Sequence, residues 1–210
     1  MLYNIRYQLN LYRRYSYWKD AKCIYIHVPK AAGTSINRAI YGRTLGHYKA
    51  REISSKFPSL YENSFVFSFV RNPWSRLLSA YKFVKKGRTE TMGVRNLKQY
   101  QVPEFESFER FLMEWLPKKK LNELDFIFQP QYLFLLNENR QPIVDFIGKI
   151  ENFDDDIEFV EGRLGYSLDI EHHNSTKDGG CYKDEYKNKA MINMVRELYS
   201  EDIKIFGYEF

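Results

Sequence analysis

The sequence predicts a single-domain α/β protein with a P-loop-like three-layer fold, in which helices flank a central, mainly parallel sheet. Residues 23–28 and 65–70 are two continuous apolar runs, as expected of buried strands at the centre of a parallel sheet. Helical periodicity follows both runs, and strands that alternate with helices are typical of this architecture. A length of 210 residues, 44% of them hydrophobic, is enough for one sizeable core.

The chain begins with a predicted extension, residues 1–20, which precedes a main domain of residues 21–210. Within the extension, residues 2–18 are expected to form an amphipathic helix. Its apolar face would hold Leu2, Ile5, Leu9 and Tyr12. Such a helix either docks on its own domain or lies on a membrane surface. After the first strand, a helix is predicted over residues 34–43.

The second apolar run leads into a predicted helix start at Asn72 and Pro73. Asparagine is a favoured N-cap residue, and proline suits the first helical position. Apolar residues then recur at helical spacing as far as Val84. Residues 85–103 are polar and contain glycine, so a loop is expected there.

The rest of the chain continues the alternation. Its predicted elements are helices over residues 105–116 and 122–137, a strand over 142–150, a helix over 154–164, a loop over 171–183 and a helix over 184–200. The first of these helices carries an aromatic stripe that is expected to be core. Gly165 is the expected C-cap of the helix before it.

Composition limits the classes of function. The net charge of +5 either favours an anionic partner (a nucleotide, an acidic glycan, a membrane surface or nucleic acid) or only aids solubility. Cys23 and Cys181 lie too far apart in sequence for a zinc or redox motif. An apolar run long enough to span a bilayer is missing, and the N-terminus lacks the apolar core of a signal peptide. A cytoplasmic location is therefore predicted.

Two strand-to-helix junctions carry residues suited to anions. The first offers Lys30, Gly33, Thr34 and Ser35, and the second offers Arg71, Ser75, Arg76 and Ser79. Helix N-termini at the carboxyl edge of a parallel sheet bind anions through backbone N–H groups. The usual phosphate loop, G-x-x-x-x-G-K-[ST], places its lysine after the second glycine. Here the lysine precedes the glycine, so the loop is of another kind.

The segments "HVPKAAGTS" and "FVRNPWSRLLSAY" together resemble the PAPS-dependent sulfotransferases, in particular the carbohydrate branch with its Golgi-type and bacterial members. The similarity extends from about residue 22 through "VDFIGKIENFDDDIEFV" to "YSEDIKIFGYEF". It implies the co-substrate 3'-phosphoadenosine 5'-phosphosulfate (PAPS), the product PAP and no metal. The residues that it assigns to the phosphosulfate are Lys30, Ala32, Gly33, Thr34 and Ser35. It assigns Arg71 and Ser79 to the 3'-phosphate, and Lys30 also neutralises charge on the leaving oxygen.

The acceptor hydroxyl needs a base, which histidine supplies most readily near neutral pH. The resemblance favours His47, which follows the first helix. His27, expected to be packed and hydrogen-bonded within its strand, and the loop residues His172 and His173 are alternatives, as is a carboxylate. Glu151 is expected to form a structural ion pair or to lie near the site.

Two further segments bear on the site by resemblance. A late loop that covers the nucleotide would use Asn174, Ser175 and Lys177, although a plain exposed loop is an equal alternative. Animal relatives often have a histidine in the segment that matches "FIFQPQY". This chain has Gln129 and Gln131 there, so that histidine's role is absent.

The resemblance therefore implies in-line transfer of a sulfuryl group to a carbohydrate hydroxyl, on a polysaccharide or a lipid-linked glycan. One alternative is a P-loop kinase or NTPase, for which the lysine order is wrong. Another is a basic aromatic protein that binds nucleic acid or membrane through its N-terminal segment. Nucleic acid is not expected as the main partner, whereas peripheral membrane contact through residues 1–18 stays an expectation.

Overall fold

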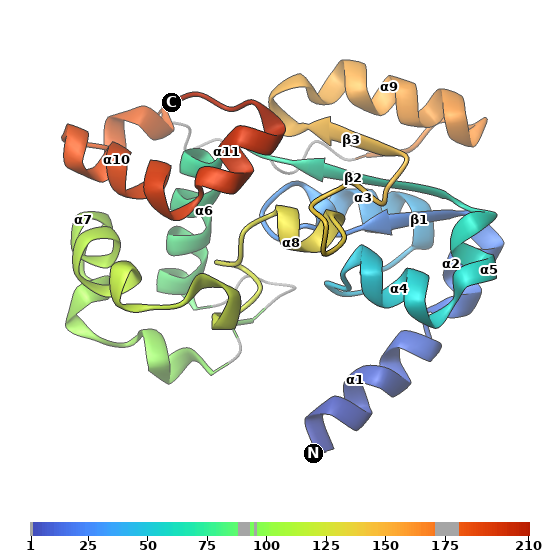
Figure 1. Ribbon diagram of the computed structural model, residues 1–210, viewed down its shortest axis with the longest axis horizontal. Coiled ribbons are helices and arrows are strands. Elements are labelled where there is room, and N and C mark those ends of the chain that lie inside the picture. Colours follow the sequence, from blue (N-terminus) through green and yellow to red (C-terminus); the bar gives the residue numbers. More distant parts are fainter. Residues whose placement is uncertain (1, 88–92, 95, 171–180) are drawn as a thin grey trace. The chain divides into compact units, whose positions relative to one another are not determined.

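A computed structural model describes residues 2–87, 93–94, 96–170 and 181–210 of the chain (Figure 1). These residues form two compact units. The first unit comprises residues 1–70 and 131–175, and the second comprises residues 71–130 and 176–210. The first unit holds a three-stranded parallel sheet flanked by helices, which confirms the predicted α/β class. The predicted boundary at residue 20 stays a prediction.

The sheet has the order β1-β2-β3, and both neighbouring pairs are parallel. Its strands are β1 (Cys23–Ile26), β2 (Phe65–Val70) and β3 (Phe146–Lys149). Cys23 pairs with Phe65 and Phe67 pairs with Phe146. All of β1 and all of β2 beyond Phe65 are buried, as their continuous apolar sequences predict.

The third strand is shorter than the predicted run of residues 142–150. Asp145 accounts for its start. The Asp145 N–H donates to the Val66 carbonyl oxygen (2.7 Å), and its carboxylate Oδ2 accepts from the Val66 N–H (2.7 Å). A side chain thus takes the place of a backbone ladder partner before β3 begins.

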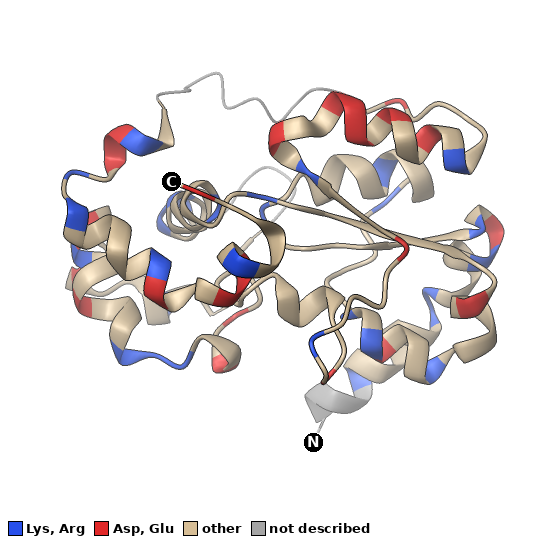
Figure 2. Cartoon of the chain, turned by 45° about the horizontal axis from the view of Figure 1, so that its top comes forward, with Lys and Arg blue, Asp and Glu red and all other residues tan. Residues whose placement is uncertain are grey.

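Helices surround the sheet in the first unit. They are α1 (Leu2–Tyr12), α2 (Tyr15–Ala21), α3 (Gly33–Tyr41), α4 (Ala50–Lys56), α5 (Pro58–Glu62), α8 (Tyr132–Leu135) and α9 (Phe153–Leu164). On α9, the Phe153 ring packs 5.3 Å from Phe69 and the Phe159 ring 4.5 Å from Phe146. Gly165 ends α9 with a left-handed φ of 79°, as predicted. Acidic residues gather on α9 (Figure 2), and three of them lie in its first turn, where the helix dipole favours negative charge.

The N-terminal segment departs from its prediction. Instead of one helix over residues 2–18, there are two, with a break at Arg13 and Arg14. Arg14 Nε donates to the Leu45 carbonyl oxygen (3.0 Å), which anchors the break. On the predicted apolar face Leu9 and Tyr12 are exposed, whereas Leu11, which lies outside that face, is buried.

The second unit is built on α6 (Pro73–Lys86), whose start was predicted. The Asn72 side-chain oxygen accepts hydrogen bonds from the N–H groups of Trp74 (3.1 Å) and Ser75 (3.4 Å). The other helices are α7 (Phe108–Arg110), the π-helix Phe111–Trp115, α10 (Lys189–Leu198) and α11 (Ser200–Phe206). Short 3-10 turns occur at Leu97–Tyr100, Pro103–Phe105, Leu116–Lys118, Leu121–Glu123 and Tyr182–Glu185, and in the first unit at Ile150–Asn152.

An aromatic core holds the second unit together. The predicted stripe Phe105, Phe108, Phe111, Leu112 and Trp115 is buried throughout. The rings of Phe105 and Phe111 lie 5.0 Å apart, and Phe111 and Phe128 lie 5.5 Å apart. Much of the chain's high aromatic content therefore serves packing in this unit.

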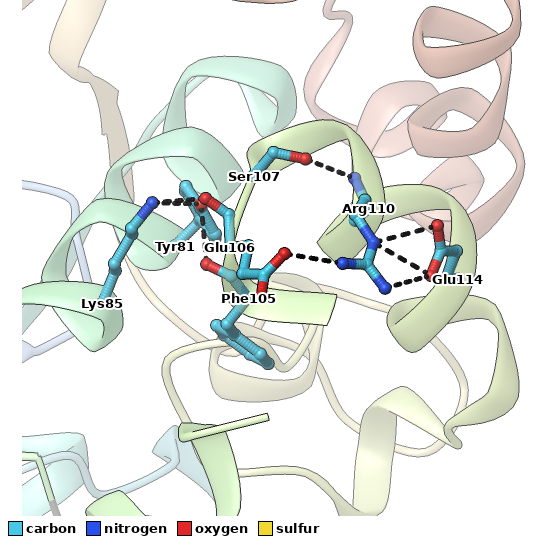
Figure 3. A network of polar contacts seen from close by, with 7 residues as sticks. All are labelled: Tyr81, Lys85, Phe105, Glu106, Ser107, Arg110 and Glu114. Carbon is cyan, nitrogen blue, oxygen red and sulfur yellow. Dashed lines mark hydrogen bonds and ion pairs between the residues drawn. The ribbon is translucent and has the colours of Figure 1, made fainter. Parts of the chain in front are cut away.

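A polar network beside this core joins the end of α6 to residues 105–107 (Figure 3). Lys85 Nζ donates to the Glu106 carbonyl oxygen (2.6 Å), and the Tyr81 hydroxyl donates to the Phe105 carbonyl oxygen (3.1 Å). Arg110 forms ion pairs with Glu106 and Glu114 (2.8 and 3.3 Å). The bonds from Tyr81 and Lys85 satisfy the carbonyl groups of Phe105 and Glu106, which lie between the 3-10 turn Pro103–Phe105 and α7.

Two predicted helices have different bounds. Of the predicted helix over residues 122–137, only Tyr132–Leu135 (α8) is α-helical, because carbonyl groups before α8 accept from Arg76 instead of forming a helical ladder. The Arg76 guanidinium donates to the carbonyl oxygens of Ile127 (3.3 Å) and Gln129 (2.6 Å). The predicted helix over residues 184–200 begins later, at the N-cap Asn188, whose side chain accepts from the Met191 N–H (3.0 Å). In the part of the chain that the structure describes, no helix is long and apolar enough to cross a bilayer.

Candidate functional site

Residues 27–32 connect β1 to α3 and form a tight, strained loop. Lys30 (φ 67°) and Ala32 (φ 52°) both have left-handed backbone conformations, which non-glycine residues adopt rarely and mostly at functional sites. The Tyr25 hydroxyl donates to the Ala31 carbonyl oxygen (3.4 Å). Left-handed residues in such turns direct backbone N–H groups into concavities that bind anions. The N-terminus of α3 adds the positive end of a helix dipole.

Gly33, the first residue of α3, is required by a close approach of His27. A Cβ atom at position 33 would lie 1.9 Å from the His27 Cδ2 atom and 2.2 Å from its Nε2 atom. Real Cβ atoms do not approach other atoms so closely, so the imidazole ring lies directly against the glycine. The Gly33 carbonyl oxygen in turn accepts a hydrogen bond from the Asn37 side-chain amide (2.7 Å). The loop and the first turn of the helix are thus locked together.

His47 lies beside this loop, in contact with His27. Its Nδ1 atom is 3.0 Å from the His27 carbonyl oxygen, and the centroids of the two rings are 4.1 Å apart. Since a carbonyl oxygen can only accept, Nδ1 carries the proton in this bond. In neutral His47 the Nε2 atom then holds the lone pair, which is the state of a general base.

His27 is almost fully buried, with 6% of its surface exposed. Its Nδ1 atom finds no hydrogen-bond partner among the described residues, unlike the hydrogen-bonded histidine that the sequence predicts. Burial holds the pKa of His27 well below its usual range, and the nearby charges of His47 and Lys30 lower it further. His27 is therefore neutral at pH 7, and it follows β1 rather than lying within it.

In the second unit, Arg71 precedes α6 and is oriented by it. Arg71 Nε donates to the Ser75 hydroxyl oxygen (3.0 Å), one turn before Ser79. Arg76, which the sequence places with this group, has another role. It is 1% exposed, its guanidinium holds the carbonyl groups described above, and burial lowers its pKa.

The other predicted residues are spread over the chain. The structure gathers Lys30, Ala32, Gly33, Thr34, Ser35 and His47 around the loop after β1. Glu151 is exposed and lines a pocket of about 490 Å³ with Ile147, Lys149, Asn152 and Asp156 at the end of β3. The Gln129 side-chain amide donates to the Leu124 carbonyl oxygen (2.7 Å), and Gln131 is fully buried. Asn174, Ser175, Lys177, His172 and His173 lie outside the described residues.

Two supporting residues were missed by sequence reasoning: Tyr25 and Asn37. Asn37 lies four residues after Gly33 on a helix, a spacing from which a side chain can reach back to a carbonyl group. Asn37 also accepts from the Leu45 N–H (3.3 Å), which ties the segment before His47 to α3. Among the described residues, no group of three or more His, Cys, Asp or Glu side chains could hold a metal ion.

Comparison with known proteins adds three findings. The model of a family described as "Sulfotransferase family" matches residues 13–209. An uncharacterized protein from Archaeoglobus fulgidus is 32% identical over 122 residues, which are 57% of this chain and 84% of that protein. No solved structure gives a significant match.

Proposed function

The chain belongs to the sulfotransferase family, and from this premise we propose that it transfers a sulfuryl group from PAPS to a hydroxyl group of a carbohydrate. One observation carries the proposal furthest. A loop with two left-handed residues, a lysine and a histidine whose Nε2 atom carries the lone pair lie together after β1. Sulfuryl transfer needs this combination, because it depends on positioning, charge stabilisation and removal of one proton.

The residues present fit the two anionic ends of PAPS. Lys30, Ala32, Gly33, Thr34 and Ser35 would hold the 5'-phosphosulfate at the N-terminus of α3. The bare Cα of Gly33 and the left-handed residues before it suit close approach of an anion to the backbone. Arg71 and Ser79 would hold the 3'-phosphate, because a guanidinium binds phosphate through two parallel hydrogen bonds. Ser75 orients Arg71 for this task.

In the reaction, His47 Nε2 takes the proton of the acceptor hydroxyl as its oxygen bonds to sulfur. The bond between sulfur and the phosphate oxygen breaks, which leaves a sulfate ester and PAP. Lys30 neutralises the charge that builds on the departing oxygen. His27 holds His47 in the required tautomer through its carbonyl oxygen. PAPS, when bound, supplies the sulfuryl group with its phosphate leaving group.

Calorimetry with PAP tests the donor site. We expect wild-type protein to bind PAP, and Lys30→Ala and Arg71→Ala each to weaken binding by roughly 10- to 100-fold, the range of one charge-assisted hydrogen bond. Lys204→Ala and Arg196→Ala are matched controls, since both side chains are exposed on other helices. ATP with Mg²⁺ is the matched ligand control. Absence of PAP binding to wild type, or equal losses in the control variants, would contradict the proposal.

The acceptor class needs its own experiment. Transfer of radiolabelled sulfate from PAPS is measured across polysaccharide and lipid-linked glycan extracts, with a tyrosine peptide and a phenol as other acceptor classes. The resemblance of "HVPKAAGTS" and "FVRNPWSRLLSAY" to the carbohydrate branch supports a glycan acceptor, and the net charge of +5 suits an acidic one. Label found in the peptide or the phenol but in no glycan would overturn the carbohydrate assignment and leave the transferase assignment in place.

A further inference from the structure

The outward face of α1 carries apolar side chains that the fold does not cover. Among the described residues, five large hydrophobic side chains are exposed, and three of them lie between positions 9 and 15. They are Leu9 (53% exposed), Tyr12 (52%) and Tyr15 (38%). Single exposed apolar residues are ordinary, but three within seven positions form a patch. The sequence analysis leaves open whether this helix docks on its own domain or lies on a membrane surface, and the structure leaves Leu9 and Tyr12 of its apolar face exposed.

Basic residues lie beside these side chains. At 100° per residue, Arg6, Leu9 and Tyr12 fall on one side of α1, opposite the buried Leu11. The exposed Arg13 follows α1 directly. The rings of Tyr12 and Tyr15 pack against Phe57, with centroids 5.4 and 5.0 Å away. Lys56 Nζ lies 4.7 Å from the centroid of the Tyr12 ring. The patch therefore combines aromatic and aliphatic side chains, two of them held by packing on Phe57, with basic side chains beside them.

The charge of this region is one-sided. Residues 2–22 contain five basic residues, Arg6, Arg13, Arg14, Lys19 and Lys22, and one acidic residue, Asp20. The nearby carboxylate of Glu52 is engaged, because it accepts from the Tyr7 hydroxyl (2.9 Å) and the Lys49 N–H (2.7 Å). Acidic residues of the first unit gather instead on α9 (Figure 2). The patch thus carries a net positive charge.

We propose that this patch binds the headgroup region of an anionic lipid bilayer. It is made of Arg6, Leu9 and Tyr12 on α1, Arg13 after it, Tyr15 at the start of α2 and Lys56 at the end of α4. A helix that lies in a membrane interface has this composition: apolar and aromatic side chains enter the boundary, while arginines and lysines pair with lipid phosphates. Tyrosine suits that depth because its ring is apolar and its hydroxyl is polar. A lipid-linked acceptor would be reached from this position, but the binding itself does not depend on the proposed reaction.

Flotation with lipid vesicles tests this inference on the full chain. Wild-type protein is mixed with vesicles of phosphatidylcholine alone or of phosphatidylcholine with phosphatidylglycerol. Binding is expected only to the anionic vesicles and should weaken as salt is raised. The charge-reversal variant Arg6→Glu/Arg13→Glu should lower the partition coefficient at least about tenfold, since each basic residue near an anionic surface contributes about one decade or slightly less. Leu9→Ser/Tyr12→Ser should lower it by a similar factor.

Matched variants separate this face from general charge or hydrophobicity. Lys118→Glu/Lys204→Glu reverses two exposed charges elsewhere, and Phe159→Ser removes an exposed ring on α9. Both should bind as wild type does. Circular dichroism checks that every variant is folded.

Three outcomes would overturn the inference: no binding of wild type to anionic vesicles, equal losses in the control variants, or self-association without lipid that Leu9→Ser/Tyr12→Ser abolishes. PAP binding should be unchanged in all variants. A negative result for membrane binding therefore leaves the proposed reaction untouched, and a negative result for PAP binding leaves membrane binding untouched.

Discussion

The Nδ1 atom of His47 lies 3.0 Å from the backbone carbonyl oxygen of His27, so the protein fixes which nitrogen of His47 carries a proton. The ring of the residue that supplies the carbonyl group also packs against the His47 ring, tilted by 48°, and lies against Gly33. A single residue, His27, therefore links the proposed anion-binding loop to the proposed base.

His47→Ala should lower sulfuryl transfer by about 10²- to 10⁴-fold, the usual contribution of a general base. PAP affinity should change less than about twofold, because the proposed role of this side chain is to take the acceptor proton and not to bind the nucleotide. Single-turnover rates and calorimetry measure the two quantities. A variant with full activity would exclude His47 as the base, and one that loses PAP binding would place it in the donor site.

His27 should stay neutral well below pH 6.5, whereas its unfolded form takes up a proton near that value. The unfolded state thus binds more protons as pH falls, and the free energy of unfolding should decrease from about pH 6.5 downward, by at most about 1.4 kcal/mol per pH unit. Proton–nitrogen NMR correlations of the ring measure the titration, and urea unfolding at several pH values measures stability.

His27→Phe keeps an aromatic ring and the backbone carbonyl group but removes the titrating group. This variant should show a shallower loss of stability in acid, while His47 keeps its Nδ1–H tautomer. An unchanged slope would mean that other groups cause the acid sensitivity.

Gly33→Ala should damage the loop, because the added Cβ meets the His27 ring at 1.9 Å. We expect at least tenfold weaker PAP binding and destabilisation of about 1–3 kcal/mol, typical of overpacking. Gly162→Ala on α9 is the matched control. Its Cβ would meet nothing within 4 Å, so this change should be neutral or slightly stabilising. The double variant Gly33→Ala/His27→Ala removes the clash and should recover part of the lost stability; additive losses would contradict the contact.

Truncation of Arg76 should lower the free energy of unfolding much more than truncation of Arg71. Arg76→Ala leaves the buried carbonyl groups of Ile127 and Gln129 without their donor and should cost about 3 kcal/mol or more of unfolding free energy. Arg71→Ala should cost less than about 1 kcal/mol of stability, since the Arg71 side chain is only half-buried. Urea unfolding measures both. Equal destabilisation would show that Arg71 is structural.

The sequence predicted those parts of the fold that depend on local pattern. The β2 run, the Asn72 cap, the aromatic stripe of residues 105–116 and the Gly165 stop are each encoded by neighbouring residues. The failures depend on distant partners. Residues 122–131 do not join α8 in one helix, because the Ile127 and Gln129 carbonyl groups accept from Arg76. The N-terminal segment is two helices, and the bond from Arg14 to the Leu45 carbonyl group holds the break between them. Neither partner is visible in a local window.

The same holds for the candidate site. Spacing and resemblance named Lys30, Gly33, Arg71 and His47, but they did not show that His27 adjoins both Gly33 and His47. His27 and His47 are 20 positions apart, and only the return of the chain after α3 brings them together. Asn37 was missed for a similar reason, because its two bonds connect segments on either side of that return.

The contact between Gly33 and the His27 ring also bears on how such chains diverge. Two positions six residues apart share one small volume, so the ring at 27 leaves room for nothing beyond hydrogen at 33. In homologous sequences the two positions should change together: where residue 33 carries a side chain, residue 27 should be smaller than histidine. An alignment of many relatives would test this coupling without any protein being made.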